Sequence, residues 1–282
     1  TYAALELLGP AYTWKTEAFA LGPLKDGVLE GDLLLKGYGD PRLGFEQFWR
    51  LLRQLRAKGL REIRGDLVLD RGHFAADNHD PARFDGEPLR PYNVGPDALL
   101  LNFKSIRLGF VPDAERKSLA VYAEPAPAQL DIVNLVKLTD AACGNAWYEG
   151  LRMDLAHAGA GARLVLTGSY PAACGEKSRH VAVLDHPHFV AGVFRQLWGE
   201  LGGTFSGNLR EGATPAAARL LARGESPALA EVVREINKFS NNVMARQLWL
   251  TLGAETAKRP ARGADAEAAV RAWLAQKELR MP

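Results

Sequence analysis

The sequence predicts an α/β fold with a β-rich insertion, and three features of its patterning support this prediction. The chain starts with residues at helical spacing. Its middle consists of short segments in which apolar and polar residues alternate, and its last part returns to helical spacing. This order is the pattern of one domain that is interrupted by another. With 282 residues, the chain is long enough for about two or three domain cores.

The segment before the insertion predicts strands and helices in alternation. In chain order, the expected elements are the end of a helix at 1–9, a strand at 11–21, a strand and turn at 27–43, a helix at 44–58 and a strand at 63–74. The helix at 44–58 is indicated by an apolar stripe through Phe48, Leu51 and Leu55. The similar phrases LEGDLLL and IRGDLVLD indicate neighbouring strands of one sheet.

The rest of the chain predicts a long loop, a β-rich module and a run of helices. Residues 75–98 are rich in Asp, Pro, Asn and Gly, which is typical of a surface loop, and residues 99–185 hold the alternating segments. The elements expected after these are a helix at 186–203, a strand and turn at 204–212, a loop plus helix in the Ala-rich stretch 213–230, and helices over 226–277.

We expect these elements to form three domains. Residues 1–25 and 213–282 are assigned to one domain, and residues 26–104 and 186–212 to an inserted α/β domain. Residues 105–185 are assigned to a β-rich domain that is nested within the inserted one.

Composition argues against several classes of partner. The chain has 35 basic and 33 acidic residues, and the Lys and Arg are scattered among the acids instead of forming a stripe, so no nucleic-acid partner is expected. No apolar run approaches the roughly 18–20 residues of a membrane-spanning helix, so no membrane span is expected. The six histidines show no mutual spacing that predicts a metal site.

The two cysteines, Cys143 and Cys174, leave two interpretations open. They lack C-x-x-C spacing and no His cluster surrounds them, which argues against zinc binding and thioredoxin-type chemistry. They are either two free thiols of a cytosolic protein or one disulfide of a protein in an oxidising compartment. The residues alone do not distinguish these two states.

The stretch VVREINKFSNNVMARQLWL, residues 232–250, has helical spacing on both sides of a polar triplet, Ser240-Asn241-Asn242. The pattern Ser-x-Asn is weak by itself, since it recurs at Ser206-Gly207-Asn208. Local features predict that Ser240 begins the second helix as its N-cap. They predict no chemistry for the triplet.

A longer phrase around this triplet, ESPALAEVVREINKFSNNVMARQLWLTLG, resembles the second active-site motif of the penicillin-recognising serine enzymes, whose signatures are S-x-x-K, S-x-N and K-T-G. The phrases LEGDLLLKGYGDPRL and IRGDLVLDRGHF are similar to the inserted domain of one branch. That branch is the class C low-molecular-mass penicillin-binding proteins, the D-alanyl-D-alanine carboxypeptidase/endopeptidases of DacB type. The resemblance covers essentially the whole chain.

This resemblance implies a fold, a compartment and a disulfide. The fold is the penicillin-binding-protein/β-lactamase-like catalytic domain, interrupted by nested inserted domains. The compartment is the bacterial periplasm. Members of the family carry a cysteine pair in the β-rich module, which implies a disulfide between Cys143 and Cys174.

The resemblance also implies a mechanism for the intact protein. A serine activated by a lysine attacks the D-Ala-D-Ala bond or a cross-link of peptidoglycan, and β-lactams acylate the same serine. Ser240 then relays a proton, and Asn242 holds the lysine and the substrate amide. Asn102, with Asp97 as the nearby alternative, aligns with the group that binds the amine of the stem peptide. No metal or organic cofactor is called for, and the family includes homodimers.

The chain departs from the family pattern at two of its three motifs. None of its seven serines has a lysine three positions later, and no K-T-G occurs. We therefore expect a fragment with an incomplete catalytic domain that lacks the nucleophile. The alternative is a catalytically silent peptidoglycan-binding or scaffold protein. A β-lactamase is disfavoured because those enzymes lack an insertion of this kind after the first motif.

Without the paired nucleophile and base, these 282 residues cannot be acylated by the family mechanism. We expect no stable adduct when the chain is incubated with labelled penicillin and the denatured protein is analysed by gel fluorescence and intact mass. Heat-denatured chain provides the background. A stoichiometric, serine-linked adduct would contradict the expectation.

Overall fold

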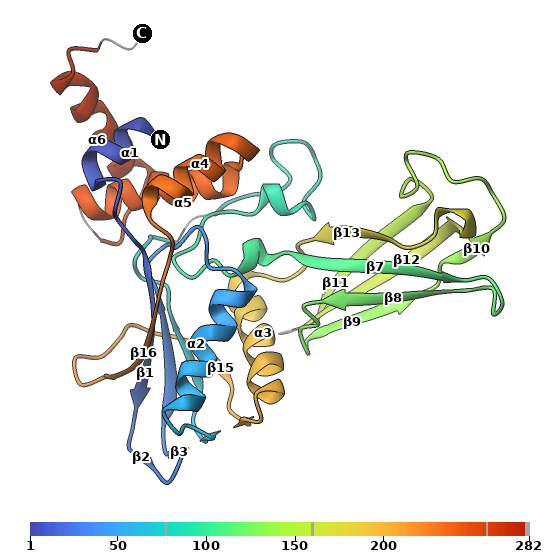
Figure 1. Cartoon of the computed structure of the whole chain (residues 1–282), viewed down its shortest axis with the longest axis horizontal. Helices are drawn as coiled ribbons and strands as arrows, with labels where there is room; N and C mark the ends of the chain where they lie inside the picture. The colour runs from blue at the N-terminus through green and yellow to red at the C-terminus, as the bar shows by residue number, and fades with distance from the viewer. Residues whose placement is uncertain (77, 159–160, 258, 280–282) are drawn as a thin grey trace. The chain divides into compact units, whose positions relative to one another are not determined.

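In the computed structural model of the chain, the described residues are 1–76, 78–158, 161–257 and 259–279, and they divide into two units (Figure 1). The first unit contains residues 1–88 and 92–103 and the chain from 197 onward. The second contains residues 89–91 and 104–196. The division into three domains that the sequence suggests stays a prediction.

A five-stranded sheet forms the centre of the first unit. Its strands, in spatial order, are β15 (Leu209–Glu211), β6 (Leu67–Asp70), β4 (Asp32–Gly37), β1 (Lys15–Leu21) and β16 (Arg219–Glu225). β1 runs antiparallel to both of its neighbours, whereas β4, β6 and β15 are parallel. The consecutive Leu33, Leu34 and Leu35 are all fully buried. Such runs are typical of strands that are covered on both faces, and the expected strands in this part of the chain are confirmed.

The edge strand β16 was not expected, because the Ala-rich stretch 213–230 predicts a loop and a helix. That prediction is wrong for the part that pairs with β1, where Leu220 lies opposite Phe19. Ala, Leu and Arg all have high helix propensity. This stretch nevertheless pairs with the open edge of β1, so pairing over long sequence distance overrides local preference.

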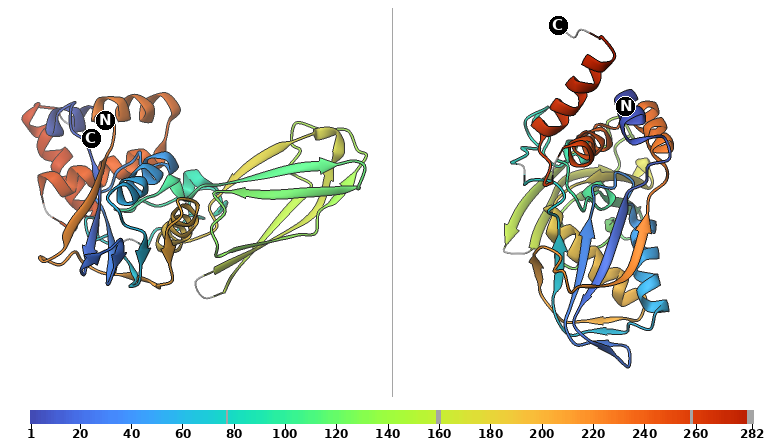
Figure 2. Two further views of the ribbon diagram at one scale, coloured as in Figure 1. Left: turned by 60° about the horizontal axis from the view of Figure 1, so that its bottom comes forward. Right: turned by 90° about the vertical axis from the view of Figure 1, so that its left-hand side faces the viewer.

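A smaller sheet and one helix complete this layer. The sheet has the order β14 (Thr204–Phe205), β5 (Glu62–Ile63), β3 (Val28–Leu29) and β2 (Leu24–Lys25). The predicted helix at 44–58 is confirmed as α2, Phe45–Ala57, and its stripe through Phe48, Leu51 and Leu55 is buried. The helix lies beside β16 (Figure 2). Leu51 of α2 is next to Gly224 of β16.

The other layer of the first unit is helical, as expected. It consists of α1 (Tyr2–Leu8), α4 (Leu229–Phe239), α5 (Asn242–Thr256) and α6 (Gly263–Gln276). Their apolar faces share a core that contains Trp14, which is 1% exposed, and the buried Leu229, Val232 and Met244. The helices expected at the start of the chain and over 226–277 are therefore confirmed.

The second unit confirms the β-rich prediction. One sheet has the order β13 (Lys177–Val181), β7 (Ile106–Asp113) and β8 (Ser118–Glu124). In the other, β12 (Gly161–Pro171) pairs with β9 (Leu130–Asn134), β10 (Lys137–Thr139) and β11 (Leu151–Ala158). The expected helix at 186–203 is α3, His186–Glu200, whose first residues belong to this unit.

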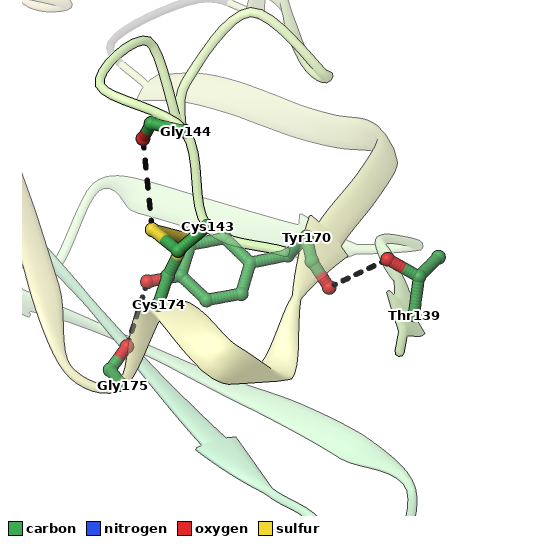
Figure 3. The surroundings of a disulfide bond; sticks show 6 residues. All are labelled: Thr139, Cys143, Gly144, Tyr170, Cys174 and Gly175. Atoms are coloured by element: carbon green, nitrogen blue, oxygen red, sulfur yellow. Dashed lines mark hydrogen bonds between the residues drawn. A yellow bond between two sulfur atoms is a disulfide. The ribbon is translucent and has the colours of Figure 1, made fainter. Parts of the chain in front are cut away.

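A disulfide joins Cys143 to Cys174 in the second unit, which confirms the expected pair (Figure 3). The cysteines lie 31 positions apart, with 4.8 Å between their Cα atoms. Beside the bridge, the hydroxyl of the fully buried Tyr170 donates a hydrogen bond of 2.8 Å to the carbonyl of Gly175. The bridge therefore closes a loop that contains all of β11 and β12.

Loss of this cross-link should destabilise the second unit. We expect the double variant Cys143→Ser, Cys174→Ser to lose roughly 3–4 kcal/mol of unfolding free energy in that unit, because the unfolded chain regains the entropy of the loop. Urea unfolding, followed by hydrogen exchange of peptides from β7 and β12, measures the change. Wild type with its disulfide reduced should match the variant. Equal stability of the oxidised wild type and the variant would contradict the prediction.

Candidate functional site

The polar triplet forms a sharp reversal between α4 and α5. Ser240 ends α4 in the left-handed region, with φ of 50° and ψ of 42°. Asn241 is the N-cap of α5, and its side-chain oxygen accepts a hydrogen bond of 3.0 Å from the backbone N–H of Met244. The prediction that Ser240 caps the second helix is wrong, because the Asn241 side chain is the one that reaches the third amide of that helix.

This arrangement leaves the two candidate catalytic side chains at the surface. Ser240 and Asn242 are both exposed, whereas Val243 and Met244 next to them are buried and anchor the start of α5. Within the described part of the chain, neither the Ser240 hydroxyl nor the side-chain amide of Asn242 forms a hydrogen bond. Non-glycine residues in the left-handed region concentrate at functional sites. The reversal therefore presents a hydroxyl and an amide on either side of a residue that is used for capping.

An ion pair fixes α4 against the turn that follows β4. Arg42 Nη1 lies 2.6 Å from Glu235 Oε2 on α4. The turn itself is closed by Asp40, whose carboxylate accepts a hydrogen bond of 2.7 Å from the Arg42 backbone. Burial raises the pKa of Asp40 to about 6, although the Arg42 backbone N–H and the charge of Arg42 act against this shift. The hydrogen bond from the Arg42 backbone to Asp40 keeps the turn closed.

Asn102 is held close to the same turn. Its backbone N–H donates a hydrogen bond of 2.8 Å to the carbonyl of Leu43. Asn102, Phe103 and Lys104 follow one another in the left-handed region, with φ of 46°, 53° and 51°. Phe103 packs against the helical core that α4 and α5 share. The partly buried Asn102 is therefore fixed by its own backbone and by its neighbour, at a cost of about 1 kcal/mol or more for each such residue.

Asp97, the other candidate for substrate binding, is buried and engaged inside the protein. Arg71 Nε lies 3.1 Å from Asp97 Oδ1 and 2.9 Å from Oδ2, and Arg71 Nη2 also donates to Oδ2. Burial opposes the charge of Arg71, but the hydrogen bonds and charges of Asp97 and Glu211 outweigh it and raise the pKa of Arg71. The amine of a substrate would have to compete with this guanidinium for the carboxylate.

Sequence reasoning missed Gln247, which contacts Asp97 from α5. The side chain is fully buried. Its oxygen accepts a hydrogen bond of 2.9 Å from the Asp97 backbone N–H, and its amide nitrogen donates one of 2.8 Å to the Asp97 carbonyl. A signal was present in the sequence, because Gln247 falls on the apolar stripe of the predicted helix, four positions after Val243. A polar residue at such a position needs a buried partner.

The described side chains of this site suit hydrogen bonding and proton relay better than nucleophilic attack. No lysine or histidine among the described residues forms a hydrogen bond with Ser240, so the hydroxyl has no base to activate it there. The described residues include no group of three or more His, Cys, Asp or Glu that could hold a metal ion. Over the same residues, no helix is both long and apolar enough to cross a membrane.

Comparisons of the sequence with a family model and with individual proteins agree on one family. The sequence model of the D-Ala-D-Ala carboxypeptidase 3 (S13) family matches residues 1–281. A D-alanyl-D-alanine carboxypeptidase of Actinomadura sp. (strain R39) is 28% identical over 263 residues, which cover 90% of this chain and 48% of that protein. The D-alanyl-D-alanine carboxypeptidase DacB of Haemophilus influenzae is 24% identical over 278 residues, which cover 99% of this chain and 57% of that protein. The chain thus spans about half the length of these curated relatives.

Solved structures confirm the fold class. The crystal structure of penicillin binding protein 4 (dacB) from Haemophilus influenzae superposes with a TM-score of 0.77 at 23% identity, covering 99% of this chain and 60% of the other. The same protein, complexed with a β-lactam, gives a TM-score of 0.72 at 22% identity, covering 100% and 59%. The chain therefore has the fold of the matched part of this penicillin-binding protein.

Measurements of unfolding free energy can distinguish the capping role of Asn241 from the role of its neighbour Asn242. We expect Asn241→Ala to lower the free energy of unfolding of the first unit by about 1 kcal/mol, because the Met244 amide loses its partner. Asn242→Ala, one residue further into the helix, should change it by less than about half of that. Urea denaturation of both variants measures the difference. A larger loss for Asn242→Ala would show that the cap is assigned to the wrong residue.

Proposed function

The chain belongs to the D-Ala-D-Ala carboxypeptidase 3 (S13) family, and from this premise we propose that the whole protein is a serine D,D-peptidase of peptidoglycan stem peptides. The observation that carries the proposal is the match of the family model over residues 1–281, in which the exposed Ser240 and Asn242 stand at an S-x-N motif. The proposed reactions are removal of the terminal D-alanine and cleavage of peptide cross-links.

In the proposed mechanism, the nucleophilic serine and its lysine come from an S-x-x-K motif outside these 282 residues. The serine oxygen attacks the carbonyl of the D-Ala-D-Ala bond, and the lysine takes its proton. As the tetrahedral intermediate collapses, the carbon–nitrogen bond breaks and D-alanine leaves with a proton relayed through the Ser240 hydroxyl. Water then attacks the acyl-enzyme and releases the shortened peptide.

The geometry of the triplet supports the two roles proposed for it. A relay group must be free to accept and donate a proton, and the Ser240 hydroxyl is exposed on a left-handed residue at the end of α4. Asn242 lies at the first position of α5, where its amide can accept from a lysine ammonium and donate to a substrate carbonyl. Asn241 is already used as the cap, so it takes no part in the chemistry.

For the amine of the stem peptide, we propose Asn102 as the contact in preference to Asp97. The Asn102 side chain is partly exposed, and its carbonyl can accept a hydrogen bond from an ammonium group. Asp97 already holds the Arg71 guanidinium with both of its oxygens. A neutral amide makes a weaker bond to an amine than a carboxylate does, so discrimination between stem peptides should be modest.

The proposed location is the bacterial periplasm. The disulfide Cys143–Cys174 supports it, because disulfides form and persist in oxidising compartments. β-Lactams are proposed as inhibitors, since they resemble the substrate and acylate the same serine. No metal or organic cofactor enters this mechanism.

We expect the protein encoded by the full reading frame to be labelled by fluorescent penicillin, and Ser240→Ala and Asn242→Ala to slow acylation about a hundredfold. Loss of the relay or of the lysine contact removes stabilisation of the transition state. The second-order rate constant of acylation is measured for each variant. Asn241→Ser, which keeps the capping oxygen, is the control and should react at nearly the wild-type rate.

A folded full-length protein that takes no label would overturn the proposal. That outcome would favour a catalytically silent peptidoglycan-binding or scaffold protein in which the triplet only shapes the turn between two helices. Labelling with no effect of Ser240→Ala would keep the peptidase but remove the proposed relay.

A further inference from the structure

Gln247 makes a two-sided contact with the backbone of a loop that is distant in sequence. Its side-chain amide pairs with both the N–H and the carbonyl of Asp97, at 2.9 and 2.8 Å. Gln247 is fully buried and Asp97 is 6% exposed. A shift of the loop along α5 would break these hydrogen bonds and leave buried polar groups unsatisfied, which is costly. The contact therefore permits little displacement of the loop.

The loop is held at every step from Asp97 to Asn102. The Leu99 N–H donates to Asp97 Oδ1 at 2.8 Å, and the Ala98 carbonyl accepts from the Gly39 N–H at 2.7 Å. Residues 98–101 are all buried. Asn102 is then fixed by its hydrogen bond to Leu43. A close-packed segment of this kind transmits a shift of Asp97 to Asn102 instead of absorbing it.

On the other side, α5 connects Gln247 to Asn242 without a break. The two residues lie five positions apart on one helix, a rise of about 7.5 Å. The start of that helix is fixed by the Asn241 cap and by the buried Met244. The helix therefore behaves as a rigid spacer between the buried Gln247, which is bonded to Asp97, and the exposed Asn242.

We propose that Gln247 is a positioning residue that sets the distance between two substrate contacts, Asn242 at the S-x-N motif and Asn102 at the end of the loop. It does so through Asp97, whose role is then structural, and it touches no substrate itself. The inference rests on the proposed function. It concerns substrates that reach both contacts, namely D-Ala-D-Ala peptides with an amine on the side chain of their third residue.

Two kinds of substrate separate positioning from chemistry. A peptide with the side-chain amine needs both contacts in register, and displacement of one contact by about 1 Å can reduce a rate by up to a hundredfold. Benzylpenicillin carries no such amine and needs only the part of the site that contains Ser240 and Asn242. Loss of the two hydrogen bonds between Gln247 and Asp97 should therefore slow the reaction of the peptide much more than acylation by the β-lactam.

The test compares Gln247→Met with Thr251→Val in the full-length protein. Methionine keeps the length of the side chain and removes both hydrogen bonds to Asp97. Thr251 is also fully buried, one turn further along α5. Its hydroxyl accepts from the Trp14 indole at 2.9 Å and donates to the backbone carbonyl of Gln247 at 2.9 Å, without contacting Asp97. Thr251→Val therefore also removes two buried hydrogen bonds on the same helix and leaves the Gln247 side chain in place.

We expect Gln247→Met to lower kcat/KM for the amine-bearing peptide up to about tenfold, mostly through KM, and to change the rate of acylation by benzylpenicillin less than about twofold. Gln247→Asn, which keeps the amide but shortens the side chain by one carbon, should be intermediate. In Thr251→Val, the two substrates should change by the same factor. Hydrogen exchange at residues 97–102 should be faster in Gln247→Met than in Thr251→Val.

Equal losses for peptide and penicillin in Gln247→Met, or unchanged exchange at residues 97–102, would overturn this inference and leave the peptidase assignment intact. A wild-type protein that reacts with neither substrate would overturn the proposed function, and this inference with it. If Gln247→Met does not fold, Gln247→Asn decides, because it introduces no charge and withdraws the amide from the Asp97 backbone by one carbon.

Discussion

The arrangement of the first unit depends on Trp14, which joins three segments that are far apart in the sequence. Its backbone N–H donates to the Ser226 hydroxyl at 2.9 Å, and its carbonyl accepts from the Ser226 N–H at 3.0 Å. Its indole N–H donates to Thr251 on α5 at 2.9 Å. The start of β1 and the end of β16 are thereby held together where the chain passes into α4. Because the large ring is almost fully buried among the helices, the sheet and the helical layer share one anchor, and the place of the α4–α5 reversal follows from it.

Polar groups in this unit fall into two classes, and the difference between them marks the candidate site. Several buried ones are paired within the protein: Asp70 accepts from Gly72 and Thr214 and pairs with Lys36, and the Gln247 side-chain amide bonds to both backbone groups of Asp97. Ser240 and Asn242 are exposed, and one of them has left-handed backbone geometry. The Ser240 hydroxyl and the Asn242 side-chain amide need no protein partner, because exposed polar groups bond to water, and they are therefore accessible to a ligand.

The sequence allowed the periodic elements to be predicted but not the contacts between distant segments. The stripe of α2 and the helices after 226 follow from spacing alone, because each buries one face over several turns. β16 could not be found this way, since its strand conformation comes from pairing with β1, about two hundred residues earlier in the chain. In the site, the resemblance selected Ser240 and Asn242, while the choice of Asn241 as the cap depended on side-chain geometry. Asp97 is one of several acidic residues in a polar loop until Arg71 and Gln247 are placed against it.

The pairing of β1 with β16 also has a consequence for the order in which the sheets can form. All strands of the second unit come from one contiguous stretch, residues 104–196, so their pairing needs no residue from elsewhere in the chain. β1 can pair with β4 from the neighbouring sequence, but its other edge stays open until residues 219–225 reach it. Until then the folding chain carries an unpaired apolar strand edge, which is a target for holdase chaperones and a risk for aggregation.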